Sequence, residues 1–166
     1  LCVATTNEEL KKASIIVLPG QGAAKSCMQK LTNNFPRLQE HILNKPFFGI
    51  CLGFQILFEK SCEDNGVDCL SIIKGSVNDF SKQISGDLKV PHMGWNNVEQ
   101  KKDHTIWSNI PRTSFFYFVH SYYALAKSKE DISSTTTYDI DFTSSVIKDN
   151  IFAVSYTHLR AHETIA

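Results

Sequence analysis

The sequence predicts an α/β fold in which the first half builds a mostly parallel sheet and the second half adds antiparallel strands. In the first half, two short apolar runs, 15–18 and 47–50, are each followed by a segment with helical spacing of its apolar residues. A strand, a crossover helix and a neighbouring strand form a parallel βαβ unit. Beyond Gly66, short β-rich segments follow one another, which is typical of hairpins in a mixed sheet.

The first strand and the helices after it have clear boundaries in the sequence. The run Ile15 to Leu18 is entirely apolar and ends at Pro19-Gly20, as a buried parallel strand does. Apolar residues then recur at spacings of three and four and predict a helical stripe made of Met28, Leu31, Phe35, Leu38 and Ile42. Pro36 interrupts this stripe, so we expect two helices that meet near Asn34, with the proline in the first turn of the second.

The second strand, 47–50, leads into the most informative motif, Gly49-Ile50-Cys51-Leu52-Gly53, before a helix expected from Cys51 to about Lys60. This Gly-x-Cys-x-Gly pattern is the cysteine form of the nucleophile elbow. Side chains in place of the glycines would collide with the strand or the helix. The start of the helix would direct N–H groups at the sulfur and favour the thiolate. Cys51 is therefore the candidate nucleophile, against the alternative of a small buried core residue.

The remaining elements are short strands. The β-rich segments are 95–98, 115–119, 122–126, 133–138 and 143–147, and the apolar run 151–154 predicts one more buried strand. The 166 residues, 42% of them hydrophobic, suit a single domain with one core. The chain contains no internal repeat or low-complexity linker.

The composition excludes several classes of function. Lysine and arginine balance aspartate and glutamate at 17 each, so no strong field attracts nucleic acid or an anionic membrane. No apolar stretch approaches the ~20 residues that cross a bilayer, and no secretory leader is visible. The five cysteines include no Cys-x-x-Cys pair, which suggests neither a disulfide framework nor a metal site. We therefore expect a cytoplasmic protein.

Other polar residues have both a functional and a structural interpretation. The loop after the first strand, 19–24, offers backbone N–H groups to an anion, or it is an ordinary turn. Gln55 lies one helical turn after Cys51 and either contacts a polar substrate or is a partly exposed helix residue. His92 and His120 lie in unusual aromatic contexts, but such histidines are more often structural than catalytic.

Four motifs, in order along the chain, resemble those of class I glutamine amidotransferases. The segment Gly49 to Gln55 is similar to their nucleophile motif, and Leu18 to Ala23 is similar to their oxyanion loop. Lys89 to Asn96 and Tyr117 to Tyr123 are similar to segments typical of the glutaminase subunits of imidazole glycerol phosphate synthase. The resemblance covers about 14–154. It implies a three-layer, flavodoxin-like fold with helices on both faces of a central, mostly parallel sheet.

The resemblance also implies a reaction. The Cys51 thiolate attacks the side-chain amide of L-glutamine, ammonia leaves, and the thioester is hydrolysed to glutamate. A cyclase subunit with a (β/α)8 barrel, the partner in a heterodimer, receives the ammonia and makes imidazole glycerol phosphate in histidine biosynthesis. The glutaminase step uses no cofactor and no metal.

The same resemblance assigns residues to the site. The backbone N–H groups of Gly22 and Leu52 would form the oxyanion hole. The residues expected to contact glutamine are Gln55, Glu63, His120, Ser121 and Tyr122. The residues expected at the cyclase interface are His92, Met93, Gly94 and Trp95.

The far end of the chain departs from the family pattern. Alignment on strand 151–154 puts Thr157 where the catalytic histidine belongs and Leu159 where its orienting glutamate belongs, and His158 is displaced by one residue. We therefore expect 155–166 to be a non-native tail. The domain 1–154 is expected to lack the family's N-terminal strand–helix unit. Without a base, the chain itself is expected to be inactive.

Two alternatives remain open at this stage. The first is a glutaminase of the same class that serves another pathway, such as guanylate or anthranilate synthesis. The second is a non-catalytic interaction subunit that keeps the fold and the partner surface but lacks the base.

Overall fold

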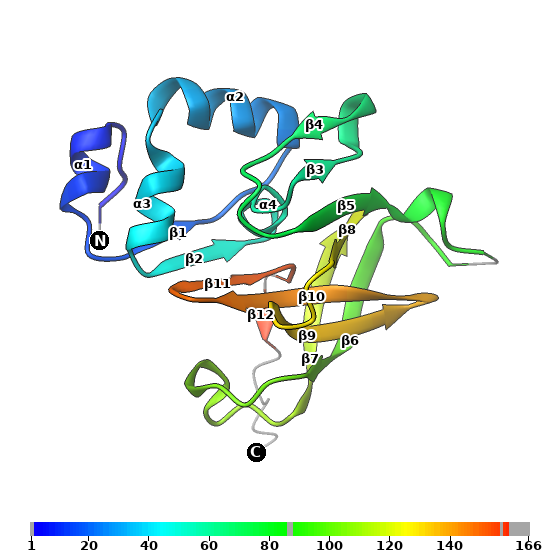
Figure 1. The fold of residues 1–166 in the computed structure, drawn as a ribbon. Helices are drawn as coiled ribbons and strands as arrows, with labels where there is room; N and C mark the ends of the chain where they lie inside the picture. The colour runs from blue at the N-terminus through cyan, green and yellow to red at the C-terminus, as the bar shows by residue number, and fades with distance from the viewer. Residues whose placement is uncertain (1, 86–87, 157, 160–166) are drawn as a thin grey trace, which may run out of the picture.

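The computed structural model describes residues 2–85, 88–156 and 158–159. Its helices are α1 (Asn7–Lys12), α2 (Ala24–Asn34), α3 (Leu38–Asn44) and α4 (Leu52–Gln55), with short 3-10 helices η1 (Glu63–Asn65), η2 (Phe80–Lys82) and η3 (Thr105–Trp107). Its strands are β1 (Ile16–Leu18), β2 (Phe47–Ile50), β3 (Lys60–Ser61), β4 (Val67–Asp68), β5 (Gly75–Asp79), β6 (His92–Gln100), β7 (Thr113–His120), β8 (Tyr122–Ala126), β9 (Ile132–Tyr138), β10 (Ile140–Lys148), β11 (Ile151–Val154) and β12 (His158–Leu159). In Figure 1, helices α1, α2 and α3 lie above β1 and β2, and strands β11, β10 and β9 lie below them.

The first half contains the predicted βαβ unit. Strand β1 pairs parallel to β2, and α2 and α3 form the connection between them. Pro36, however, precedes α3 instead of lying in its first turn. The N–H of Leu38 donates to the carbonyl of Phe35, so Pro36 occupies the second position of a tight turn, where its fixed φ is favoured.

Strand β11 joins the two halves of the sheet. It pairs parallel to β2, with Phe47 opposite Ile151, and antiparallel to β10, with Lys148 opposite Ile151. From β10 the sheet continues through antiparallel pairs to β8 and β5 on one side and to β9, β6 and β7 on the other. Among the described strands, parallel pairing is limited to β1–β2, β2–β11 and β3–β5. The α/β class is therefore confirmed, but "mostly parallel" describes only the strands around β2.

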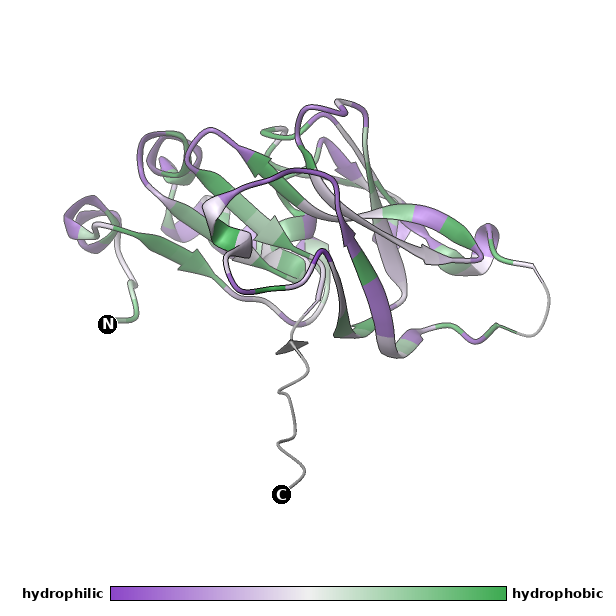
Figure 2. Ribbon diagram, turned by 90° about the horizontal axis from the view of Figure 1, so that it is seen from below, coloured by the Kyte–Doolittle hydropathy of each residue, from purple (hydrophilic) through white to green (hydrophobic). Residues whose placement is uncertain are grey.

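The two faces of the parallel strands are covered differently. On one face, Ile16 and Phe47 pack with Ile42 of α3 in the main apolar core. On the other face, Phe48 stacks on Phe152 with ring centroids 5.4 Å apart, and Trp107 of η3 packs edge-on against Phe152. A 3-10 turn and aromatic strands thus cover this face, where the prediction placed helices. Figure 2 shows hydrophobic residues concentrated in the strands, whereas α1 is largely hydrophilic.

The second half agrees with the predicted strands: β8 and β11 have the predicted bounds, β9 gains one residue, and β6, β7 and β10 are longer than predicted. The sequence reading missed α1, β5 and the short pair β3–β4. Helix α1 is marked by a capping box, in which Thr6 and Glu9 satisfy each other's backbone N–H groups. In the part of the chain that the structure describes, none of the helices has the length and apolar character needed to span a bilayer.

The helix expected from Cys51 to about Lys60 is shorter than predicted, because α4 ends at Gln55. The carbonyl groups of residues 56–58 accept hydrogen bonds from the N–H groups of residues 70–73. They are therefore engaged with a distant segment and do not continue the helical ladder. The side chains of Ile56, Leu57 and Phe58 are all buried, so packing fixes this turn.

Candidate active site

Cys51 lies at a sharp turn between β2 and α4. Its backbone has φ 55° and ψ −107°, a conformation that residues other than glycine rarely adopt. The surrounding structure holds it there: its N–H donates to the carbonyl of Val154 at 2.8 Å, and its own carbonyl accepts from Phe54 and Gln55 at 3.0 and 3.1 Å. Strained backbone of this kind is concentrated at functional sites, and the geometry is that of a nucleophile elbow.

The flanking glycines are required by close backbone contacts. A Cβ on Gly49 would lie 2.6 Å from the carbonyl oxygen of Gly53, and a Cβ on Gly53 would lie 1.9 Å from the carbonyl oxygen of Leu18. Both distances are shorter than real Cβ contacts. The predicted collision of side chains at these positions with strand or helix is confirmed.

A cavity of about 360 Å³ opens beside Cys51. Its lining residues are Gln21, Gly22, Cys51, Leu52, Gln55, Glu63, Val119, His120, Ser121 and Tyr122. The structure thus brings together all eight residues that the sequence suggested for the nucleophile, the oxyanion hole and the glutamine contacts. Their individual roles stay predictions.

The Cys51 thiol does not have the low pKa expected from the sequence. Burial raises its pKa above the usual value, and a hydrogen bond from the Leu52 N–H opposes this only in part. The expectation that the start of the helix favours the thiolate was wrong for a physical reason. Helix α4 is a single turn with a small dipole, whereas burial of the sulfur disfavours its charged form.

The backbone N–H groups expected to form the oxyanion hole belong to Gly22 and Leu52. Gly22 has φ +103° and lines the cavity. The N–H of Leu52 donates to the carbonyl of Gly20, at a long 3.4 Å. Hydrogen bonds to charged acceptors are shorter and stronger than neutral ones, so an oxyanion in the cavity would compete well for this donor.

Glu63 reaches the cavity from η1 and is held by the start of α2. Its Oε2 accepts a hydrogen bond of 2.7 Å from the N–H of Ala24, the first residue of that helix. The preceding residue, Ala23, makes no side-chain cap, so Glu63 supplies the acceptor that a capping residue would provide. The carboxylate is thereby held at the wall of the cavity.

The far wall of the cavity is the segment between β7 and β8. His120 Nδ1 lies 2.8 Å from the carbonyl oxygen of Tyr122, and the N–H of Phe80 donates to the carbonyl of Ser121 at 3.1 Å. Burial first, and then the neighbouring His92, lower the pKa of His120 to about 3. His120 is therefore a neutral, hydrogen-bonded residue at neutral pH.

The residues expected at the partner interface divide between two faces of β6. Met93 and Trp95 point outward and are 60% and 46% exposed. Across the β6–β7 ladder, Phe115 and Val119 are also exposed; we call these four residues the β6–β7 patch. His92 is only 3% exposed and points into the core, because alternate residues of a strand face opposite sides. It therefore forms no part of this surface.

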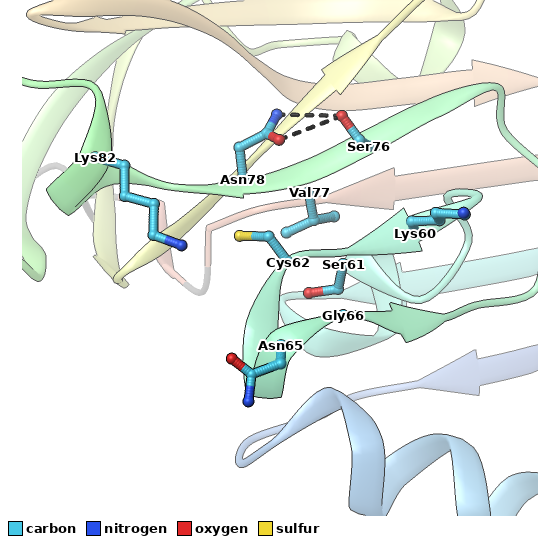
Figure 3. A pocket seen from close by; sticks show the side chains of 9 residues that line it. All are labelled: Lys60, Ser61, Cys62, Asn65, Gly66, Ser76, Val77, Asn78 and Lys82. Atoms are coloured by element: carbon cyan, nitrogen blue, oxygen red, sulfur yellow. Dashed lines mark hydrogen bonds between the residues drawn. The ribbon is translucent and has the colours of Figure 1, made fainter.

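A second cavity, of about 470 Å³, lies beside the loop that carries Glu63 (Figure 3). Its two lysines, Lys60 and Lys82, lie at opposite ends, and Ser76 and Asn78 hydrogen-bond to each other at 3.2 Å. Its polar groups do not converge on one point. This cavity lacks the ligand geometry of a binding site.

Two residues near the site were missed at the sequence level. Phe80 packs against both histidines, and Asn96 hydrogen-bonds to His92. Asn96 belongs to the unusual segment 90–96, so it could have been singled out, whereas nothing local marks Phe80.

The expected loss of the base rests on three residues, of which Thr157 lies outside the described residues, whereas His158 and Leu159 form β12, paired antiparallel to β7. Ser155 and Tyr156, also placed in the expected tail, are buried, and the Tyr156 ring packs 4.1 Å from that of Phe116, centroid to centroid. The boundary at 154 and the missing N-terminal unit stay predictions.

Known proteins resemble this chain over most of its length. The family model "Glutamine amidotransferase class-I" matches residues 2–156. The imidazole glycerol phosphate synthase subunit HisH of Hydrogenovibrio crunogenus is 45% identical over 156 residues, which are 93% of this chain and 73% of that protein. The subunit of the same name from Nitrosococcus oceani is 41% identical over 166 residues, 96% of this chain and 77% of that protein.

Solved structures agree on the fold. A glutamine amidotransferase from Thermotoga maritima superposes with a TM-score of 0.62 at 19% identity, covering 89% of this chain and 57% of that one. The glutaminase domain of Trypanosoma brucei CTPS, solved with bound acivicin, gives a TM-score of 0.55 at 16% identity and covers 91% of this chain. Together with the family match and the cysteine elbow at its cavity, these likenesses show that the chain belongs to the class I glutamine amidotransferase family.

Proposed function

We propose that this protein is the glutaminase subunit of an imidazole glycerol phosphate synthase. It hydrolyses L-glutamine to glutamate and ammonia, and a cyclase subunit uses the ammonia to make imidazole glycerol phosphate in histidine biosynthesis. The observation that carries the proposal is the Cys51 elbow, which opens into a cavity lined by every residue expected to contact glutamine. The relatives named HisH support the choice of pathway.

The reaction uses Cys51 as a covalent nucleophile. The thiol proton passes to a base, and the sulfur bonds to the amide carbon of glutamine. The oxygen of the tetrahedral intermediate accepts hydrogen bonds from the N–H groups of Leu52 and Gly22. In the structure without substrate, the Leu52 N–H makes only a long hydrogen bond to the Gly20 carbonyl. The carbon–nitrogen bond then breaks, the nitrogen takes up a proton and leaves as ammonia, and water hydrolyses the thioester.

The base is a separate requirement, because burial raises the pKa of the Cys51 thiol. His120 does not supply it. One of its ring nitrogens lies at the Tyr122 carbonyl and the other at His92. The family resemblance gives this role to a histidine just after β11, at the position where this chain has Thr157.

The polar head of glutamine binds opposite Cys51. The Glu63 carboxyl group is held there by the N–H of Ala24, and a carboxylate suits the α-ammonium group of the substrate. Gln55 is buried at the cavity floor and offers an amide. The Ser121–Tyr122 segment closes the far wall.

The partner binds on the β6–β7 patch. Exposed apolar side chains that gather on one surface mark interaction sites, and tryptophan and methionine are enriched in such interfaces. Met93 and Trp95 are the central residues of this surface. The complex works in the cytoplasm without a cofactor, nucleic acid or membrane.

The test is glutamine hydrolysis by the native gene product mixed with a purified cyclase subunit. We expect glutamate release coupled to imidazole glycerol phosphate formation, and loss of both in Cys51→Ala. Hydrolysis without ammonia transfer to this cyclase would favour a glutaminase of another pathway. Tight binding to the cyclase without any hydrolysis would favour a non-catalytic subunit.

A further inference from the structure

Two buried histidines face each other across the β6–β7 ladder. His92 and His120 are register partners, and His92 Nδ1 lies 2.9 Å from His120 Nε2. Both side chains are buried. The rings packed around them are those of Phe80, Phe118, Tyr138 and Phe142. A histidine pair in so apolar an environment needs every ring nitrogen satisfied.

The hydrogen-bond partners fix which nitrogen carries each proton. The Tyr122 carbonyl can only accept, so His120 Nδ1 carries a hydrogen and donates to it at 2.8 Å. The Ser155 hydroxyl lies 3.5 Å from the same nitrogen, at the limit of a hydrogen bond. Burial keeps the ring neutral, which leaves His120 Nε2 as an acceptor. His92 Nδ1 must therefore be the donor across the ladder.

The far end of the chain of hydrogen bonds agrees with this assignment. Asn96 Nδ2 lies 3.2 Å from His92 Nε2 and donates to the Thr137 carbonyl at 2.9 Å. The Asn96 Oδ1 accepts from the N–H of Asn97, which fixes the amide orientation. His92 Nε2 faces a donor and must be unprotonated. All donors thus point one way, from Asn96 through both histidines to the Tyr122 carbonyl.

The two ends of this chain lie at different functional surfaces. One end is the carbonyl of Tyr122, in the wall of the cavity beside Cys51. The other end is β6, where Met93, next to His92, and Trp95 point outward on the β6–β7 patch. Hydrogen bonds weaken steeply as they lengthen or bend, and close-packed interiors transmit small shifts. A displacement of β6 therefore reaches the cavity wall.

We propose that His92 and His120 are positioning residues that couple the partner surface on β6 to the Ser121–Tyr122 wall of the glutamine cavity. The proposal rests on the proposed glutaminase function. Docking of the cyclase on Met93 and Trp95 sets the position of β6, and the ordered hydrogen bonds carry that position to the cavity wall. The histidines neither attack nor exchange protons with the substrate.

A matched pair of variants separates the hydrogen bond from the packing. His92→Phe keeps an aromatic ring among the same neighbours but removes the donor to His120. His92→Asn loses the ring but places an amide N–H close to the position of Nδ1. His41→Phe, on α3 and away from the histidine pair, is the control for the same chemical change.

The assay measures kcat and KM for glutamine with the cyclase absent and saturating, and the Kd of the complex. In His92→Phe we expect the stimulation of kcat/KM by the cyclase to fall about tenfold, the size of one lost buried hydrogen bond, with Kd unchanged. His92→Asn should regain most of the stimulation, and His41→Phe should match the wild type. Wild-type stimulation in a folded His92→Phe protein would overturn the proposal.

A measurement on the unmodified protein keeps the proposal testable if His92→Phe does not fold. Long-range ¹H–¹⁵N NMR spectra at neutral pH report which ring nitrogen of each histidine is protonated. We expect Nδ1–H on both His92 and His120, and shifts of the Ser121 and Tyr122 amides when cyclase binds. An Nε2–H tautomer on either residue, or unmoved amides in the complex, overturns the coupling. A complex that shows the expected spectra but no hydrolysis instead overturns the proposed function alone.

Discussion

Replacing Gly53 by alanine should destabilise the protein far more than a glycine-to-alanine change usually does. The new Cβ would lie 1.9 Å from the Leu18 carbonyl oxygen, where real contacts are longer than 3.0 Å. Strand β1 and helix α4 must therefore separate by about 1 Å, or the oxygen must leave its place. Both are backbone atoms of packed elements, so no side-chain rotation relieves the contact. We expect the free energy of unfolding to fall by about 3 kcal/mol or more, which is the upper range for overpacking substitutions.

The assay is chemical denaturation of wild type and variant, followed by circular dichroism. Gly66→Ala is the matched control: it also places a Cβ at a glycine, there with φ +112°, and meets none of the described atoms within 4 Å. It should cost only the backbone strain, about 1–3 kcal/mol. If Gly53→Ala is as stable as Gly66→Ala, the tight elbow does not depend on this glycine and the reasoning fails.

Four further predictions follow from the site. Burial raises the pKa of Cys51, so its alkylation by iodoacetamide should still be accelerating above about pH 8; a rate that is already maximal near neutrality contradicts this. The folded-state pKa values of His92 and His120, about 4 and about 3, lie below the 6.5 of an unperturbed histidine. The unfolded chain therefore binds more protons than the folded protein below pH 6.5. The free energy of unfolding should fall by up to about 1.4 kcal/mol per pH unit per histidine as pH drops from 6.5 toward 4. Urea titrations of His92→Phe should show a shallower fall with pH than those of the wild type, and equal slopes would refute the assignment. Trp95→Ala should weaken cyclase binding by about 2 kcal/mol, roughly thirtyfold in Kd, in calorimetry. As a control, the free energy of unfolding of this variant should equal that of the wild type. Glu63→Ala should lower the free energy of unfolding by about 1 kcal/mol, because it removes the cap of α2, and it should raise KM for glutamine. Glu63→Gln should keep the cap but should also raise KM for glutamine.

The sequence was most informative where chemistry is local. The turn at Cys51 needs small neighbours within two residues on each side, so its pattern shows in a short window. Strands β1 and β2 were likewise evident, because a buried parallel strand is a short apolar run. The motifs around Gly22 and His120 were recognisable for the same reason, although their convergence on one cavity depends on the fold.

What the sequence missed depends on contacts between distant segments. The helix after Cys51 was overextended because residues 70–73, which take its carbonyl groups, are far along the chain. The thiolate expectation failed because desolvation of a sulfur is set by tertiary packing. The inward direction of His92 depends on the register of β6 against β7, since a shift of one residue would exchange the two faces.

The double pairing of β11 has a consequence for how the chain acquires its structure during synthesis. Strand β2 has one neighbour, β1, close by in sequence, but its other neighbour is β11. The same four-residue strand closes the ladder of β10. Until it leaves the ribosome, both halves keep an open edge, which is a template for pairing with other chains. We therefore expect nascent chains that end before Ile151 to depend on chaperones, and release of that dependence to coincide with the emergence of Val154.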